Sequence, residues 1–300
     1  MAGLAGGYLT AMLLVVAALL PATAHAQLMG HNLTGDYGLR SGSQAPAGRY
    51  AGFFLPVYVA DTLKGPAGGK IDAEGRVKVV AIAPFVLYVS ETKILGGNYG
   101  ALVVPSFANT ALELPRLDVD DSQFGLADLY VVPFQLGWHL PTVDVTASYG
   151  FFAPTGRFEP GADDNIGLGM WSHELSVGAT AYLDQAKSWH LATSAFYEIH
   201  SGKEGIDQKV GDLLTLEGGF GKTFSNFSSV GLAYYAQWKV TEDSGADLPF
   251  LLRGRKDRGF GLGPEVDLLQ GGLALRGLFE FGSNSSLEGF VFVASLALPF

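Results

Sequence analysis

Charged side chains recur at alternate positions in the second half of the chain, within segments that otherwise carry apolar residues. Alternate residues of a β-strand point to the same face, so these side chains would share the polar faces of predicted strands. Acidic residues outnumber basic ones there, and a pore lined in this way would disfavour anions. The predicted lumen-lining residues are Asp144, Glu174, Glu198, Glu217, Lys239, Glu265, Asp267, Arg276 and Glu280.

A second chemistry, hydrolysis of lipid esters by a serine and histidine pair, has few candidate residues. His173 lies beside Ser172 and Glu174, and His200 lies beside Ser201. Adjacent residues of a strand point to opposite faces, so Ser172 and His173 cannot form a pair with each other. A partner would have to come from a neighbouring strand. We therefore predict no enzyme, no catalytic residue and no cofactor, and keep the barrel hydrolase as the alternative.

The composition excludes other classes of protein. The chain has 300 residues with 19 Lys+Arg against 29 Asp+Glu, a formal net charge of −10, so nucleic-acid binding is not expected. It has no cysteine, which excludes disulfides, thiolate metal sites and cysteine nucleophiles. The histidines, including His139 and His190, show no metal-ligand spacing, so we predict no metal. Only 16% of residues are charged and the mean hydropathy is +0.24, which indicates an unusually apolar protein.

The first 26 residues predict a cleaved secretory signal peptide. An apolar stretch around residues 11–20 is followed by Pro21 and by the small-x-small run Ala24-His25-Ala26. An N-terminal membrane anchor is the alternative. The next apolar run, residues 77–89, contains Lys78 and Pro84 and is shorter than the about 20 residues of a membrane-spanning helix. The high hydropathy must therefore be spread over many short segments, which favours an outer-membrane β-barrel.

Alternation of apolar and polar residues predicts about twelve antiparallel strands over residues 50–300. The last strand alternates over residues 290–300 and ends the chain on Phe300, which resembles the assembly signal that the barrel assembly machinery reads in outer-membrane proteins. Long and short connections alternate between strands, as in such barrels. The expected strands are residues 50–63, 76–90, 98–110, 126–139, 142–153, 170–183, 189–199, 213–223, 229–241, 258–269, 273–282 and 290–300.

The first four predicted strands are apolar on both faces and contain prolines. A proline within a strand removes a ladder hydrogen bond and typically marks a bulge or kink. Pro84, Pro105 and Pro133 are the predicted strand kinks. They can be explained by barrel curvature alone, or by a kinked wall that shapes a lumenal pocket or a lateral opening.

Residues 27–49 precede the first strand and show no strong periodicity. They are rich in Gly and Ser, and can form either a flexible tail or a partial plug of the barrel. An acidic lumen would attract Arg40, whereas in a tail Arg40 would be solvated.

Several stretches together resemble the outer-membrane family named for the meta-pathway of phenol degradation. They are Asp36–Gln44, Gly125–Trp138, Tyr149–Gly156 and Gly261–Pro264, and the resemblance covers nearly the whole mature chain. It implies an outer-membrane barrel associated with the transport of aromatic compounds, with no established catalytic residues.

The sequence therefore predicts a bacterial outer-membrane channel for passive uptake of small hydrophobic or aromatic, phenol-like compounds. The expected partners are outer-membrane lipid, the assembly machinery and the small-molecule solute, with no nucleic acid. A barrel lipid hydrolase and a structural barrel with a closed lumen remain the alternatives.

Overall fold

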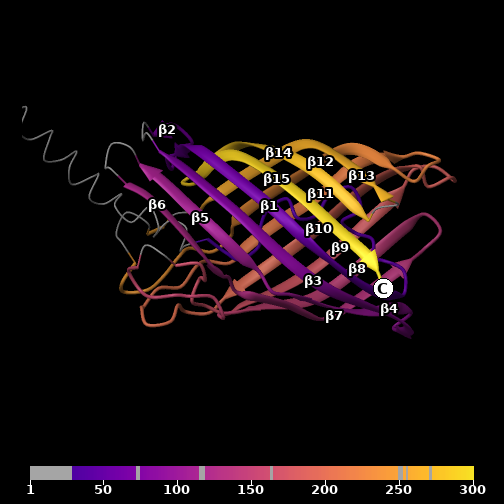
Figure 1. Cartoon of the computed structure of the whole chain (residues 1–300), viewed down its shortest axis with the longest axis horizontal. Helices are drawn as coiled ribbons and strands as arrows, with labels where there is room; N and C mark the ends of the chain where they lie inside the picture. Colours follow the sequence, from indigo (N-terminus) through magenta and orange to yellow (C-terminus); the bar gives the residue numbers. More distant parts are fainter. Residues whose placement is uncertain are drawn as a thin grey trace, which may run out of the picture.

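The structure, a computed structural model, describes residues 29–71, 75–114, 119–162, 165–248, 253–254, 256–269 and 272–300. The predicted signal peptide lies outside these residues. Figure 1 shows the described strands winding obliquely around one barrel, with β2, β5 and β6 at the end opposite the C-terminus. No helix in the described part of the chain has the length and hydropathy of a membrane span.

Every strand pairs with its neighbours in antiparallel register. The strands are β1 (Gly48–Lys64), β2 (Lys70–Ile71), β3 (Arg76–Ile94), β4 (Gly97–Val104), β5 (Phe107–Leu114), β6 (Val119–Leu126), β7 (Leu129–His139), β8 (Val143–Ala153), β9 (Ser172–Tyr182), β10 (Trp189–His200), β11 (Leu213–Thr223), β12 (Ser229–Lys239), β13 (Arg258–Leu268), β14 (Leu273–Asn284) and β15 (Leu287–Pro299).

The sheet closes because β1 pairs with β15 on one edge and with β3 on the other. Within the ring, β4 and β5 are successive pieces of one strand position, and β6 and β7 share the next, so the barrel has twelve positions. The prediction of a twelve-stranded antiparallel barrel is confirmed. Pairing of β1 with β15 joins the first and last strands of the ring, so the backbone N–H and C=O groups on their facing edges are hydrogen-bonded. A sheet that crosses a bilayer needs its backbone groups paired in this way.

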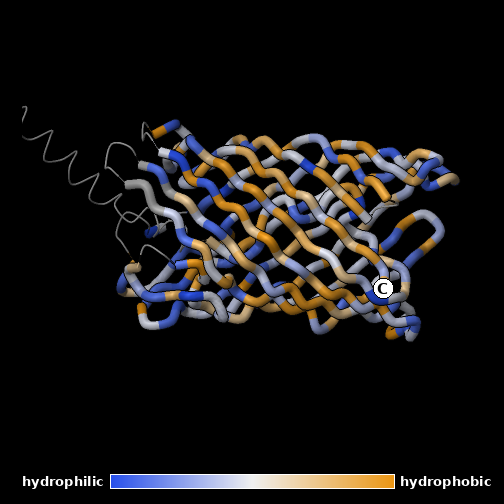
Figure 2. Tube along the Cα trace, viewed as in Figure 1, coloured by the Kyte–Doolittle hydropathy of each residue, from blue (hydrophilic) through white to orange (hydrophobic). Residues whose placement is uncertain are grey.

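The outside of the barrel is apolar. Side chains such as Leu175, Val177, Leu232 and Phe279 are 52–62% exposed on the strands, while their sequence neighbours are buried or half-buried. Figure 2 shows hydrophobic residues recurring along the strands of the barrel wall. This pattern is the inverse of a soluble barrel and matches a wall that faces lipid.

The first four predicted strands differ from the structure in two respects. The predicted strand 98–110 is divided at Pro105-Ser106 into β4 and β5. The predicted connection between residues 110 and 126 contains a further strand, β6, which Ala127-Asp128 separates from β7. Pro84, on β3, lies at the level where β3 exchanges β4 for β5 as its partner. Pro133 lies within register shifts on both sides of β7, as a bulge requires.

The division leaves β6 as an end of the sheet. β5 and β6 pair with each other, but β8 pairs with β7 and β9, so the described strands place no partner on the second edge of β6. Among the described strands, the wall is therefore split at the junction of β6 and β7, which contains Asp128. Figure 1 shows β6 at the end of the barrel opposite the C-terminus.

Candidate functional site

The interior of the barrel is occupied by residues 29–47, here called the N-terminal segment. It forms no regular strand, and it contacts residues of β7, β8, β9, β10, β11, β13 and β14 before the chain enters β1 at Gly48. Its path is close to the wall: a Cβ added at Gly42 would lie 2.2 Å from a backbone atom of Ala179. Only glycine permits this approach.

Three buried carboxylates on the wall accept hydrogen bonds from the backbone of the segment. Glu198 accepts from the amide of His31 at 2.7 Å, and Glu217 accepts from the amides of Gly35 and Tyr37 at 2.9 and 2.8 Å. Glu265 accepts from the amide of Leu39 at 3.2 Å. The segment has no strand partner, so its backbone amides need acceptors, and a buried carboxylate needs hydrogen-bond donors. The hydrogen bonds between them meet both needs. A further amide, that of Asn32, donates to Glu198 at 3.1 Å.

Arg276 donates hydrogen bonds to backbone carbonyl oxygens of the segment, whereas the three glutamates accept from its amides. Its Nη1 donates to the carbonyl oxygen of Gly35 at 2.9 Å and also to that of Asp36, while its Nε lies 3.2 Å from Glu265. Glu265 and Arg276 are cross-strand partners, so they form a pair that binds both an amide and a carbonyl of the segment. Burial raises the pKa of Asp36 to about 7, and the nearby Arg276 charge opposes that rise.

Glu174 and Glu198 are direct cross-strand partners inside the barrel, which places two acids side by side. Like charges in this position are destabilising unless donors separate them. The Asn32 side chain donates to Glu174 at 3.0 Å, and the Tyr130 hydroxyl donates to it at 2.5 Å. The N-terminal segment thus supplies donors to both acids.

The remaining predicted residues have separate partners. Asp144 accepts from Ser43 of the segment, and half-buried Glu280 accepts from the hydroxyls of Tyr58 and Tyr235. Lys239 is buried at the end of β12 and pairs with Asp243 and Asp257 of the following connection, at 2.9 and 3.0 Å.

Arg40 is exposed, and its guanidinium donates to Thr223 at 2.9 Å. It also lines a cavity of about 170 Å³ together with Asp36, Asp267 and Arg276. The structure thus brings Arg40 and the predicted residues Asp267 and Arg276 to one polar cavity beside the segment.

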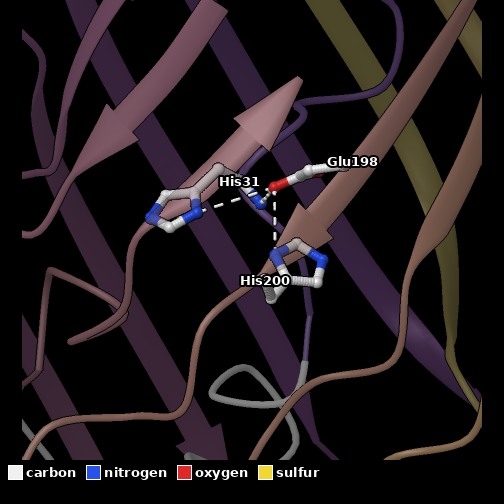
Figure 3. Close-up of side chains that lie close together, drawn as sticks. All are labelled: His31, Glu198 and His200. Carbon is white, nitrogen blue, oxygen red and sulfur yellow. Dashed lines mark hydrogen bonds and ion pairs between the residues drawn. The ribbon is translucent and has the colours of Figure 1, made fainter. Parts of the chain in front are cut away.

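The structure brings together five residues that the sequence analysis did not group, and we call them the histidine cluster: His31, Asp128, Ser172, Glu198 and His200. The Nε2 of His31 lies 2.8 Å from Asp128, while its Nδ1 lies 2.7 Å from the hydroxyl of Ser172. Figure 3 shows the two imidazole rings on either side of the Glu198 carboxylate. Burial lowers the pKa of His31, but hydrogen bonds with Asp128 and Glu198 outweigh burial, so the net effect raises it.

Asp128 also holds the connection that follows β8. Its carboxylate accepts from the amides of Gly156 and Leu168 at 2.8 and 2.7 Å. Asp128 and Gly156 belong to two of the stretches on which the family resemblance rests, so these stretches meet at the point where the wall splits. The adjacent ring of Phe152 is stacked on His31 and on Tyr130, with centroids 4.6 and 4.2 Å apart.

Of the residues considered for a hydrolase, Ser172 pairs with His200 of the neighbouring strand, whereas His173 and Ser201 have other partners. His173 is exposed on the outer face and accepts or donates a hydrogen bond with Tyr149. Ser172 is on the inner face, 0% exposed, and contacts His200 and His31 instead. Ser201 bonds to the backbone of Trp171 and Gly202.

Opposite the acids, the inner wall is apolar. Ala83, Phe85 and Val104 are buried together, and half-buried side chains of five strands pack against them. This surface, which we call the apolar wall, comprises Phe54, Ala83, Phe85, Leu87, Leu102, Val104, Tyr130 and Ala297.

A closed barrel with an apolar outer surface and a polar segment inside is the architecture of outer-membrane proteins. The chain is a bacterial outer-membrane β-barrel. It belongs to the family described as "Putative MetA-pathway of phenol degradation", whose model matches residues 60–296. The resemblance drawn from the sequence is thereby confirmed.

The comparison with solved structures agrees on the fold. An outer membrane channel from Pseudomonas putida F1 superposes with a TM-score of 0.74 at 13% identity, covering 90% of this chain and all of that one. Two other barrels are more distant. The β domain of the Bordetella autotransporter BrkA has a TM-score of 0.47 at 16% identity, covering 84% and 99% of the two chains. The monoaromatic hydrocarbon channel CymD has a TM-score of 0.43 at 10% identity, covering 86% and 90%. A search of curated protein sequences found no match.

Proposed function

We propose that the barrel is a passive channel for uptake of small hydrophobic or aromatic compounds, with no chemical step and no cofactor. The observation that carries this proposal is the apolar wall inside an otherwise polar lumen. An apolar inner surface lowers the free energy of an aromatic solute relative to water, whereas a sugar gains nothing from it. Membership of a family named for phenol degradation supports the same class of solute.

The N-terminal segment acts as the plug in this proposal. It occupies the side of the lumen formed by β8–β14, where Glu198, Glu217 and Glu265 bind its backbone. These acids are then engaged by the segment and do not form an open water-filled path. Hydrophilic solutes and ions are excluded, while the surface opposite the acids stays apolar.

The split at Asp128 gives apolar solutes a lateral route through the wall, at the level where His31 of the segment contacts Asp128. β6 has an unpaired edge at this level, and Gly125 and Phe124 of β6 lie next to the split. A solute that passed between β6 and the connection after β8 would have to displace Ile166, which lies against Gly125, and would move between the lumen and the lipid beside Asp128. The kinks at Pro84, Pro105 and Pro133 shape this wall.

The organisation of the chain follows from the same proposal. Residues 1–26 are a signal peptide that is removed, residues 27–49 are the plug, and residues 50–300 are the barrel. The strand β15 ends at Pro299, next to Phe300, and closes the ring with β1 and β14. We propose that this strand and its terminal aromatic residue are what the barrel assembly machinery binds.

The test is solute influx into liposomes that contain the refolded mature chain, corrected for leak through empty vesicles. A small phenolic compound should enter faster than through empty vesicles, and a sugar of similar mass should not. Influx of both would indicate a general pore, and influx of neither would contradict the channel. The heat-inactivated protein in identical vesicles is the control for membrane damage.

A further inference from the structure

Three atoms suited to metal coordination converge inside the histidine cluster. Glu198 Oε1 lies 3.6 Å from His31 Nδ1 and 3.6 Å from His200 Nδ1 (Figure 3). All three ligand atoms lie within 4.8 Å of one another. Ligands at about 2.0–2.1 Å around a tetrahedral zinc ion are separated by about 3.3 Å, so the two 3.6 Å separations nearly fit and the widest one, up to 4.8 Å, must shorten by about 1.5 Å.

Asp128 orients the His31 ring as a metal ligand requires. Asp128 accepts from His31 Nε2 at 2.8 Å, which fixes the proton on Nε2 and leaves the Nδ1 lone pair facing Glu198. A carboxylate bound to the far nitrogen is the usual support of a metal-ligating histidine. The Asp128 carboxylate is itself held by the amides of Gly156 and Leu168, so its position is fixed.

Without a cation, the contacts of Ser172 fix the proton positions on the two rings. Its hydroxyl lies 2.7 Å from Nδ1 of both His31 and His200, so it donates to one ring and accepts from the other. The second ring must then hold its own proton on Nδ1, which leaves its Nε2 as an acceptor. The Nε2 of His200 is buried and has no partner among the described residues. A cation between the rings would use both Nδ1 lone pairs at once.

We propose that His31, Glu198 and His200 bind one Zn²⁺ ion. Two neutral imidazoles and one carboxylate are a ligand set that zinc prefers, with a water or Ser172 available as the fourth ligand. His31 belongs to the N-terminal segment, whereas Glu198 and His200 belong to β10. The ion therefore joins the segment to the barrel wall and holds the segment inside the lumen. This binding is separate from solute transport and can be measured without it.

The site is enclosed by the segment itself, since the His31 side chain is 6% exposed. We therefore expect zinc to be taken up as the segment docks. The full mature chain is refolded at pH 8 in detergent with and without Zn²⁺, dialysed against metal-free buffer, and analysed for bound metal. Co²⁺ replaces Zn²⁺ in a parallel refolding, because its visible absorption reports the number and geometry of ligands.

One zinc ion per chain is expected, with the absorption of four-coordinate Co²⁺. His31→Ala and His200→Ala should each abolish both signals. Asp128→Asn, which keeps an acceptor for the backbone amides, should weaken binding about 10- to 100-fold. His190→Ala is the matched control, because His190 is also buried on β10 but lies outside the cluster and should leave binding unchanged.

His31 precedes the first strand, so its replacement leaves every strand of the barrel intact, and folding of each variant is checked by heat-dependent gel mobility. Zinc bound equally by the His31→Ala variant and the unaltered chain would overturn the proposal. So would the absence of stoichiometric zinc in the unaltered chain after refolding with the metal. If the unaltered chain binds zinc but admits no phenolic compound, the channel proposal is contradicted and the zinc site is supported.

Discussion

The two sides of the barrel wall differ in both regularity and chemistry. The side formed by β8–β14 has continuous strands, and its inner face carries the acids and Arg276 that bind the N-terminal segment. The side formed by β1 and β3–β7 has divided strands, two bulged pairings around Pro133 and an apolar inner face. Regular strands hold charged groups at fixed positions, while the divided strands lose ladder hydrogen bonds where they break. In the proposed function, the N-terminal segment therefore binds the side formed by β8–β14, and the solute contacts the apolar wall.

Deleting residues 29–45 should have the largest effect, because it removes the polar filling and spares the apolar wall. Barrels of roughly eight strands are filled by side chains, whereas those of roughly 16–18 strands enclose water, so an emptied barrel of intermediate size should conduct ions. We expect ion conductance in planar bilayers to rise by about an order of magnitude. Conductance equal to that of the full mature chain would show that the segment does not limit permeation.

The next effect is expected from Glu217→Ala, which removes the acceptor of two buried amides. Each unpaired buried donor costs about 1–3 kcal/mol, so docking of the segment should weaken by that order. Proteolysis of the segment in the folded barrel measures the change, and ion leak should rise with it. Glu91→Ala, an exposed acid on β3, is the control. Unaltered proteolysis in the Glu217 variant would mean that these two hydrogen bonds contribute little.

On the other side of the barrel, Leu102→Gln keeps the side-chain size but makes the apolar wall polar. The amide would lack partners there, and phenolic influx should fall about two- to tenfold while ion conductance stays low. Thr215→Ala, a buried residue on β11, provides the comparison for the acidic side. Equal loss of influx in both variants would remove the distinction between the two walls.

The smallest effect is expected from a change of pH, which alters the protonation of Asp36 in the segment. Its pKa is about 7 in the docked segment and near 3.8 when the segment is released, because burial favours the neutral acid. Docking therefore binds a proton: the stabilisation is complete below about pH 4 and is lost as the pH rises through 7. Arg276, Glu174 and Glu217 lie close enough to interact electrostatically with this group. Ion leak should rise a few-fold from pH 5 to pH 8, and Asp36→Asn should flatten that profile.

The strands could be predicted because each depends on a local pattern. Alternation identified every position of the ring, and the polar faces of 142–153 and 189–199 followed from the same two-residue period. Division of the strands at Pro105 and Asp128 was only partly foreseeable. Proline marks a lost hydrogen bond, but whether the chain bulges or breaks there depends on its neighbours.

The histidine cluster could not be predicted from spacing. Its members come from the N-terminal segment, the junction of β6 and β7, and the strands β9 and β10. The segment lacks periodicity, so nothing in its sequence states which wall residues it meets. One indication was available: Asp128 and Gly156 lie in stretches that resemble the family, although the resemblance gave neither residue a chemical role.

The central claim is that aromatic solutes cross along the apolar wall while the segment stays docked. The chain has no cysteine, so Ser43→Cys and Asp144→Cys can be introduced as a unique pair where their side chains now share a 2.9 Å hydrogen bond. Phenolic influx into liposomes is then measured with the pair joined by a short thiol crosslinker and again without it. We predict the same influx in both states. Loss of influx on crosslinking would contradict the account, because the segment would then have to move for the solute to pass.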